Sequence, residues 1–373
     1  MKIGIYTQPL RTNYGGILQA WAMQKVLRDM GHNVTTFDPD PFLSLSWKKK
    51  PFVYFKRIIN KLLGHIDTIF LENKYNTERK YIMQNLQPFI DQKINRLVFR
   101  RIEDIRVEDY DVLLAGSDQV WRPRYNRHIE HSFFDFANHS SVKRIAYAAS
   151  FGTDEWEYTE KQTKVCAELV NKFDSISVRE KSGVDLCKKY LGVDAVHVLD
   201  PTMLLQRKDY EELIDNGAPT QKPEGNLLCY ILDETEEKNS LINKVAKDRG
   251  LIPYRGQAQI HNTNVSLEER IQPPVEQWLR NFRDASFVIT DSFHACVFSI
   301  IFGKPFVVID NKQRGSARLQ SLMSLFQLED HLLSTAADYD SSNSYLISDK
   351  VYHIWDDMRY GSLAFIKDTL FNK

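Results

Sequence analysis

The chain has 373 residues, 43% of them hydrophobic, which is enough apolar material for two domains with buried cores. Its 49 basic and 49 acidic residues give a formal net charge of zero, and neither the total nor any stripe of basic residues predicts a nucleic-acid partner. No run approaches the roughly 18 apolar residues of a membrane span, so we expect a soluble, cytoplasmic protein.

The N-terminal segment predicts a strand, a loop, a helix and a second strand. Residues 2–7 form the first strand, 17–30 have helical periodicity, and 32–37 form the next strand. A chain that starts with a strand has no signal-peptide pattern. Gly15 and Gly16 directly precede the helix, where free amides at its positive end could bind phosphate or carboxylate, although turn glycines often only turn.

Residues 41–106 are charged, aromatic and irregularly periodic, and we interpret them as a helical excursion from the first domain. Within them, residues 47–59 (WKKKPFVYFKRII) form a basic and aromatic patch. Such a patch could contact an anionic membrane surface, or it could be a solvated helix face that packs on its own domain.

Two further apolar strands, within residues 110–115 and 144–149, end in small and polar residues. Ser117 and Asp118 follow the first of these strands, and Ser150 follows the second. If the strands are parallel neighbours, these strand-end loops should converge with the loop at Asn13 in one crevice.

The chain continues as alternating helices and strands up to a linker rich in Gly, Pro and polar residues, 216–225. A helix over 160–172 precedes a strand at 175–178, which ends at Arg179, and a further strand near 196–199 ends at Asp200-Pro201. We place the domain boundary in the linker, with one domain over 1–218 and a second over 219–373.

The second half repeats the α/β alternation without visible sequence repetition. We expect strands at 226–232 and 251–254, helices at 236–249 and 274–284, and a final helix at 352–371. In two-lobed proteins of this type a final helix often crosses back to the first lobe.

The segment 286–310 reads as strand, turn, helix and strand, and the chain is organised around it. Thr290, Asp291, Ser292 and His294 lie on the turn, at the carboxyl edge of the predicted sheet, where open α/β folds bind ligands. A histidine at this position could take part in catalysis, although Asp291 or Ser292 could merely cap the helix.

Four cysteines, Cys166, Cys187, Cys229 and Cys296, lie inside apolar or helical patterns, with no pair at metal-ligand spacing. We interpret them as buried thiols of a reducing compartment. No cluster in the sequence predicts a metal site.

Motifs in order along most of the chain resemble those of the polysaccharide pyruvyl transferase family. They are residues 13–20 (NYGGILQA), 115–121 (AGSDQVW), 177–180 (SVRE), 200–202 (DPT) and 290–295 (TDSFHA). The resemblance implies a glycosyltransferase-B-like fold, an α/β architecture of two Rossmann-like lobes with a cleft between them, which agrees with the two domains predicted above.

The resemblance further implies transfer of a pyruvyl group from phosphoenolpyruvate to a sugar of a surface polysaccharide or its lipid-linked precursor. The product is a pyruvate ketal, phosphate is released, and no cofactor or metal is needed. Arg179 matches the family's donor-binding arginine, since a guanidinium can grip a carboxylate or phosphate; an ion pair with Glu180 or Asp200 is the alternative. His294 matches the family's histidine and would transfer protons, with Asp291 orienting it or only capping the helix.

One position departs from the family pattern. Many relatives carry an arginine two residues before the histidine, where this chain has Ser292. Arg314 and Arg318, with Ser292 and the amides of Gly15 and Gly16, are the candidates for the second anionic end of the donor, unless both arginines are surface charges.

Asn13, Tyr14, Ser117 and Asp118 would line the cleft and contact donor or acceptor hydroxyls. Two other functions fit the same scaffold: a nucleotide-sugar glycosyltransferase, and a non-catalytic protein that binds a carbohydrate or phospho-ligand. The sequence does not identify the acceptor sugar or the oligomeric state.

Overall fold

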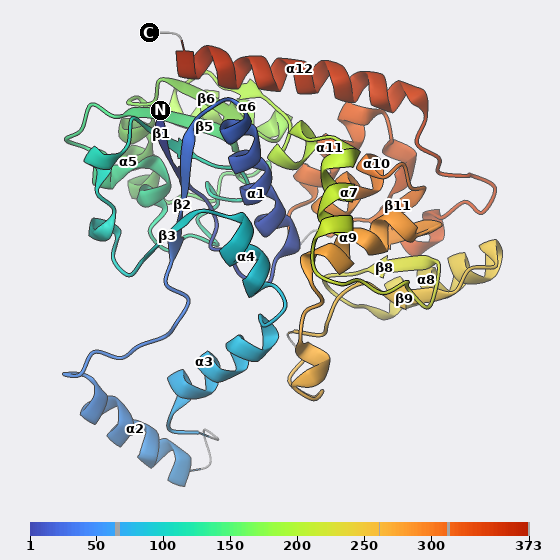
Figure 1. Ribbon diagram of the computed structural model, residues 1–373, viewed down its shortest axis with the longest axis horizontal. Coiled ribbons are helices and arrows are strands. Elements are labelled where there is room, and N and C mark those ends of the chain that lie inside the picture. The colour runs from blue at the N-terminus through green and yellow to red at the C-terminus, as the bar shows by residue number, and fades with distance from the viewer. Residues whose placement is uncertain (64–67, 261, 312–313, 372–373) are drawn as a thin grey trace.

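A computed structural model describes residues 1–63, 68–260, 262–311 and 314–371. Within these residues the chain folds into two α/β lobes, each built on an all-parallel sheet (Figure 1). The first sheet has seven strands in the spatial order β3-β2-β1-β4-β5-β6-β7, and the second has five in the order β12-β11-β10-β8-β9. The predicted architecture of two Rossmann-like lobes is confirmed.

The strands are short and mostly buried, as expected of parallel sheets covered by helices on both faces. They are β1 (Lys2–Tyr6), β2 (Asn33–Pro39), β3 (Arg96–Phe99), β4 (Val112–Ala115), β5 (Lys143–Ala149), β6 (Ser175–Val178), β7 (Val196–His197), β8 (Leu227–Tyr230), β9 (Pro253–Arg255), β10 (Phe287–Thr290), β11 (Phe306–Ile309) and β12 (Leu332–Leu333).

Helices cover the sheets and connect most of their strands (Figure 1). They are α1 (Tyr14–Asp29), α2 (Lys50–Leu62), α3 (Leu71–Ile82), α4 (Gln87–Lys93), α5 (Glu160–Val170), α6 (Lys181–Leu186), α7 (Arg207–Asn216), α8 (Glu236–Arg249), α9 (Val275–Asp284), α10 (Phe293–Ile301), α11 (Ser316–Phe326) and α12 (Asp349–Phe371).

The central strand, helix and strand follow the predicted pattern. β10 and β11 are fully buried apolar runs that pair in parallel, and every residue of α10 between them is buried. The helix ends at Ile301 with Phe302 as its C-cap, and Gly303 follows with φ of 64°, a left-handed conformation that glycine adopts without strain.

Two local predictions are wrong. The first helix begins at Tyr14 and not at Ile17, so Gly15 and Gly16 lie inside its first turn and are not a loop before it. The excursion 41–106 contains β3, which pairs with β2 and joins the first sheet. Of its four residues only Phe99 is buried, and the strand lies in a charged stretch of the sequence, so no buried apolar run marks it.

The two lobes share a hydrophobic core. The core that contains Ile17 and Trp21 of α1 continues into Trp278 of α9 and Phe298 of α10. Tyr14 of the first lobe stacks on Trp278 with ring centroids 5.2 Å apart. The lobes are therefore packed against one another and not merely linked by the chain.

The final helix α12 lies along one edge of both lobes (Figure 1). In the first lobe, Ser362 of α12 accepts a hydrogen bond from the Leu199 amide at 3.0 Å, and Lys143 donates to the Thr369 carbonyl at 2.7 Å. The sheets are separated by residues 198–226, and a domain boundary at 218 within this segment stays a prediction.

The cysteines are free thiols, of which Cys166, Cys187 and Cys296 are buried and Cys229 is partly buried. Burial raises the pKa of Cys166, Cys187 and Cys229 to about 12, so these thiols stay protonated and unreactive. In the described part of the chain, no helix combines the length and the apolar character needed to cross a bilayer.

Candidate functional site

A cavity of about 440 Å³ lies between the two lobes. This volume is within the usual range of about 300–1,000 Å³ for small-molecule sites. The first lobe contributes Thr12, Asn13, Asp118, Gln119 and Tyr125. The second lobe contributes residues after its strand ends, including Tyr230, Arg255, Gln257, Gln259, Asn262, Gln272, Asp291, Ser292, Phe293, His294, Arg314 and Arg318.

Parallel strands deliver the key side chains to this place, because their carboxyl ends meet at one edge of each sheet. Asp118 follows β4, Arg179 directly follows β6, and Asp200 lies three residues after β7. From the second lobe, His294 is the second residue of α10, directly after β10. Asp118 has φ of 71°, a conformation that is costly for a side chain other than glycine and that often marks a functional position.

Asp200 joins the polar groups of both lobes. Its Oδ2 accepts hydrogen bonds from Nη1 of Arg179 and from Oγ of Ser117, each at 2.9 Å. The same oxygen lies 3.7 Å from Nε2 of His294. Burial alone would raise the pKa of Asp200, but its interactions with the imidazole of His294 and with the guanidinium of Arg179 hold that pKa well below its usual range. Asp200 is therefore a permanent anion beside the imidazole.

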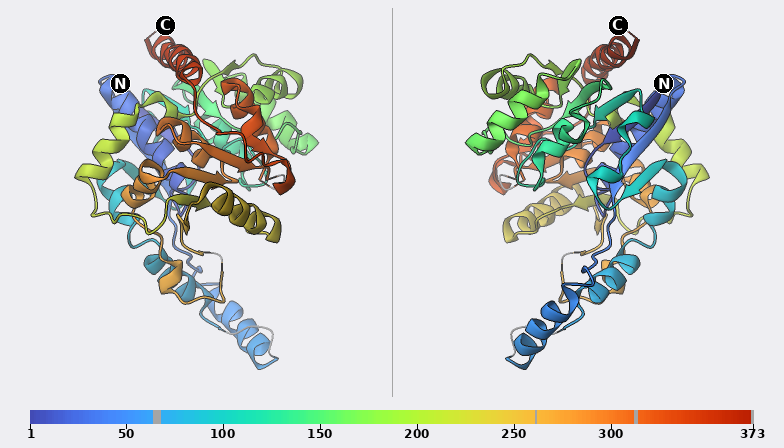
Figure 2. Two further views of the ribbon diagram at one scale, coloured as in Figure 1. Left: turned by 90° about the vertical axis from the view of Figure 1, so that its right-hand side faces the viewer. Right: turned by 90° about the vertical axis from the view of Figure 1, so that its left-hand side faces the viewer.

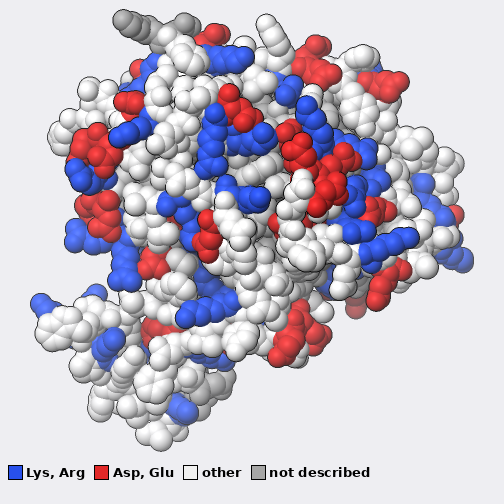
Figure 3. Space-filling view, viewed as in Figure 1, with Lys and Arg blue, Asp and Glu red and all other residues white. Residues whose placement is uncertain are grey.

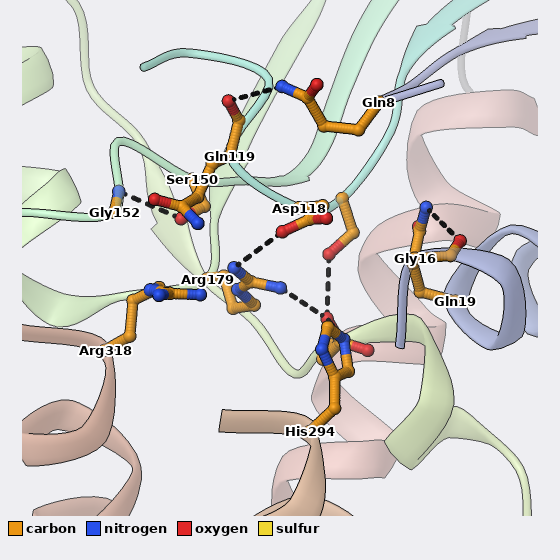
Figure 4. A network of polar contacts seen from close by, with 12 residues as sticks. Gln8, Gly16, Gln19, Asp118, Gln119, Ser150, Gly152, Arg179, His294 and Arg318 are labelled. Carbon is orange, nitrogen blue, oxygen red and sulfur yellow. Dashed lines mark hydrogen bonds and ion pairs between the residues drawn. The ribbon is translucent and has the colours of Figure 1, made fainter. Parts of the chain in front are cut away.

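Arg179 lies beneath the cavity, with a side chain only 1% exposed. Besides Asp200, its guanidinium meets Asp118 at 3.6 Å (Figure 4). It also meets Glu180 at 3.3 Å and lies 4.5 Å from the ring of Phe293. Burial alone would lower the pKa of Arg179, but these three carboxylates raise it above its usual value. The positive charge of Arg179 is therefore already balanced by the protein.

Arg318 is also a buried cation, but unlike Arg179 it has no ion-pair partner among the described residues. It is 9% exposed and lines the cavity, and its Nη2 donates to the Arg314 carbonyl at 2.8 Å. Among the described residues its Nε has no hydrogen-bond partner, and no carboxylate lies within ion-pair distance. Burial and the nearby charge of Arg179 lower the pKa of Arg318 to about 10. Figure 4 shows Arg318 pointing toward Arg179 from the second lobe.

His294 presents its two ring nitrogens to different surroundings. Nε2 is buried toward Asp200 and has no hydrogen-bond partner among the described residues. Nδ1 lies against Gly15 in the first turn of α1, where a β-carbon on that glycine would overlap Nδ1 and Cγ. Gly15 is thus the glycine that lets the imidazole approach the opposite lobe.

The prediction that Asp291 orients the imidazole is wrong. Its carboxylate accepts hydrogen bonds from the Leu232 amide at 2.6 Å and from Nζ of Lys238 at 2.7 Å. Nδ2 of Asn311 also donates to it at 3.0 Å. Asp291 therefore fixes loops of the second lobe, because it points back into that lobe and away from the histidine.

Tyr14 and Ser117 also differ from the prediction that they line the cleft. Tyr14 is fully buried, and its hydroxyl donates to the Pro273 carbonyl of the second lobe at 2.8 Å. Ser117 is buried below the cavity, where it holds Asp200. Both side chains are packed between the elements that carry the site, and neither lies on the surface of the cavity.

The remaining predicted residues lie at the cavity or beside it. Asn13, Asp118 and Ser292 line it, and Arg314 lines it while its guanidinium forms two bonds of 2.6 and 2.9 Å to Asp233. Gly16 lies one position further along α1, with its carbonyl accepting from Gln19.

Sequence reasoning missed Gln119, Phe293, Gln272 and the loop after β9, and it treated Asp200 only as a competing ion-pair partner. The signal for Asp200 was present, because the residue follows a buried strand and precedes a proline, at the same sheet edge as Arg179. Among the described residues, no three His, Cys, Asp or Glu side chains are grouped as a metal ion would require.

The comparisons with known proteins agree with this architecture. A family model described as polysaccharide pyruvyl transferase matches residues 13–313. No curated protein sequence matches the chain significantly. Arabidopsis thaliana UGT89C1 complexed with UDP-L-rhamnose is similar in structure, with a TM-score of 0.52, 8% identity and coverage of 98% of both chains.

A UDP complex of S. aureus MnaA is similar to the same degree. Its TM-score is 0.52 at 9% identity, over 99% of this chain and 95% of the other. At such low identities these likenesses concern the fold alone. They identify the two lobes as a glycosyltransferase-B-like fold, as the sequence motifs implied.

Proposed function

The chain belongs to the polysaccharide pyruvyl transferase family, and from this premise we propose that it transfers a pyruvyl group from phosphoenolpyruvate to a sugar of a polysaccharide or its precursor. The observation that carries the proposal is Arg318, a buried cation without a carboxylate partner in the described chain, at a cavity that also contains His294. An unbalanced buried charge is costly, and an anionic ligand would balance it.

We assign the binding of the donor's anionic groups to Arg318 in preference to Arg179. Three carboxylates already neutralise Arg179, so it has little charge left for a ligand, although its Nη2 lacks a hydrogen-bond partner. Arg318 has an unpartnered Nε and, among the described residues, no carboxylate within ion-pair distance. Arg318 would thereby supply the positive charge that many relatives have from an arginine at the position of Ser292. Arg179 in this proposal holds Asp200 and the ring of Phe293 in position.

His294 would exchange protons with the ligands through Nδ1, since Nε2 is turned to the permanent anion Asp200. A carboxylate on one nitrogen fixes the ring and stabilises the imidazolium that forms when the other nitrogen takes a proton. Protonation of the donor's methylene carbon makes the adjacent carbon electrophilic. Two sugar hydroxyls then form two C–O bonds to that carbon, and its bond to the phosphate oxygen breaks to give the cyclic ketal. One hydroxyl proton replaces the proton given to the methylene carbon, and the other leaves with the phosphate.

Acceptor binding is assigned to the wider part of the cavity. The cavity is larger than a three-carbon phospho-acid needs, and Gln257, Gln259 and Asn262 of the second lobe line it together with Asn13 of the first. Amide side chains both donate and accept hydrogen bonds, which suits sugar hydroxyls.

Thermal unfolding with candidate donors tests the proposal. Phosphoenolpyruvate at about 100 times its Kd should stabilise the folded protein by about 2.7 kcal/mol and raise Tm, because it binds only the native state. Inorganic phosphate should raise Tm less, since it lacks the carboxylate, and UDP should have no effect. Phosphate release from phosphoenolpyruvate, measured with a panel of free and lipid-linked oligosaccharides, then reports transfer.

Protection by UDP without protection by phosphoenolpyruvate would replace the proposal with a nucleotide-sugar glycosyltransferase. Protection by phosphoenolpyruvate without phosphate release for any acceptor would favour a binding protein.

Replacing Gly15 by alanine should lower the rate of transfer by about 100-fold or more, because the new methyl group would occupy the space in front of Nδ1 of His294. The overlap with the buried ring should cost about 1–3 kcal/mol of stability, and the better helix propensity of alanine offsets about 1 kcal/mol of this, so Tm should fall by only a few degrees. The rate of phosphate release and the Tm of the variant check both expectations.

Gly16→Ala is the matched control in the same helical turn. A β-carbon there would meet only Nδ2 of Asn13, at 3.2 Å, and this exposed side chain can move aside. Equal losses for the two variants would show that the first turn of α1 is sensitive in general and would contradict the specific contact with His294.

A further inference from the structure

The helices α2 and α3 project from the body of the protein as an arm (Figures 1 and 2). We use "the arm" for residues 41–63 and 68–82, which leave the first lobe after β2 and return to it before α4. Among the described residues of α2, none is buried, so the helix does not pack its apolar side on either lobe.

The exposed surface of the arm is strongly apolar. Trp47 is 77% exposed, Phe52 75% and Leu62 82%, and Phe55, Ile58, Ile59 and Leu63 are exposed as well. Contiguous exposed side chains of this size usually mark a surface that contacts a partner or a membrane.

The same surface is basic. Residues 41–63 contain six Lys and Arg residues and no Asp or Glu, whereas the chain as a whole has 49 basic and 49 acidic residues. Figure 3 shows the arm as a mostly uncharged surface with basic side chains on it. Apolar and aromatic side chains beside lysines on one helix are typical of helices that lie in the interface of a lipid bilayer.

The arm has a defined internal structure. Arg57 of α2 forms two bonds, of 2.6 and 2.8 Å, with Glu72 at the start of α3, and Tyr54 packs edge-on against Phe70. These contacts hold the two helices together at the turn and leave the lysines of α2 on its outer surface.

We propose that the arm docks on the surface of a membrane that contains anionic lipids. Negative headgroups match the five lysines of residues 41–63, since Arg57 is already paired with Glu72, and the interfacial region accepts Trp47, Phe52 and Leu62. A second copy of the chain fits less well, because a symmetric pairing through the arm would bring two identical basic surfaces together.

The base of the arm is connected to the cavity of the candidate site. Arg270 pairs with Glu78 of α3 at 3.2 Å, and the Gln272 amide donates to the Ile82 carbonyl at 3.1 Å. Gln272 itself lines the cavity. A membrane bound by the arm would therefore lie on the side from which a lipid-linked acceptor could enter, although the docking itself does not depend on the proposed function.

Vesicle sedimentation tests the proposal with the full-length protein. Vesicles of phosphatidylcholine with phosphatidylglycerol should sediment the protein, vesicles of phosphatidylcholine alone should bind at least 10-fold more weakly, and salt should weaken the binding. The triple variant Trp47→Ser, Phe52→Ser, Leu62→Ser should lose at least 10-fold in vesicle affinity. The triple variant Lys48→Gln, Lys49→Gln, Lys50→Gln should also lose at least 10-fold in vesicle affinity.

A matched triple on other surfaces, Ile252→Ser, Leu346→Ser, Tyr360→Ser, removes equally exposed apolar side chains and should bind vesicles as wild type does. Unchanged vesicle binding in the arm variants would overturn the proposal. So would a wild-type dimer in solution that the apolar arm variant dissociates, since the surface would then hold a second copy. Phosphoenolpyruvate should protect the arm variants from thermal unfolding as it protects wild type, which separates this inference from the proposed function.

Discussion

His294→Ala is expected to lower the rate of phosphate release from phosphoenolpyruvate by about 10²–10⁴-fold, the usual contribution of a positioned acid or base. Among the described residues that line the cavity, His294 is the only histidine, and histidine is the side chain that most often serves as a general acid or base. Its loss leaves the anion site at Arg318 in place, so phosphoenolpyruvate should still raise Tm. Single-turnover phosphate release and thermal unfolding measure the two effects separately.

His353→Ala is the control, because His353 is exposed on α12 and far along the chain from the site. It should release phosphate at the wild-type rate. A His294→Ala variant that keeps more than a tenth of the wild-type rate would remove the histidine from the proposed chemistry.

Arg318→Met is expected to weaken phosphoenolpyruvate binding by about 10- to 100-fold, since a hydrogen bond to a charged group contributes about 1.5–3 kcal/mol. The same change should leave the Tm of the ligand-free protein unchanged or raise it. The reason is that burial already disfavours the charge of Arg318, as its lowered pKa of about 10 reflects, and methionine fills a similar volume without a charge. Titration calorimetry with phosphoenolpyruvate and thermal unfolding give the two quantities.

Arg122→Met is the matched comparison at a second buried arginine. Arg122 is bonded to both carboxylate oxygens of Glu157, at 2.8 and 2.9 Å, so its removal leaves a carboxylate without its partner and should lower Tm. If Arg318→Met lowers Tm as Arg122→Met does while donor binding is unchanged, then Arg318 is a structural residue and the donor site lies elsewhere.

Much of the fold could be predicted from the sequence because its strands are buried on both faces. Runs such as Phe287–Thr290 and Phe306–Ile309 are short, mainly apolar and bounded by polar or glycine residues. They can therefore be identified from the sequence as buried strands, together with their order along the chain. β3 was missed because an edge strand of four residues with exposed positions has no such run. The start of α1 was misplaced because Gly15 and Gly16 suggest a turn, whereas tertiary packing makes them helical.

The candidate site could be predicted to the level of a sheet edge and not to the level of a side-chain contact. Which carboxylate faces His294 depends on how one lobe meets the other, and the chain between Asp200 and His294 gives no local signal of it. Asp291, three residues away in sequence, points into its own lobe, whereas Asp200, ninety-four positions earlier, faces the ring. The burial of Tyr14 is likewise a property of the interface between the lobes.

The packing between the lobes also decides how the cavity can open. A hinge rotation would have to pull Tyr14 off Trp278, break the bond to the Pro273 carbonyl and detach α12 from the Leu199 amide. Each step exposes buried apolar surface, which costs about 25 cal/mol per Å². We therefore expect the pocket to be preformed, with substrates exchanging through movements of the surrounding loops and not through rotation of one lobe against the other.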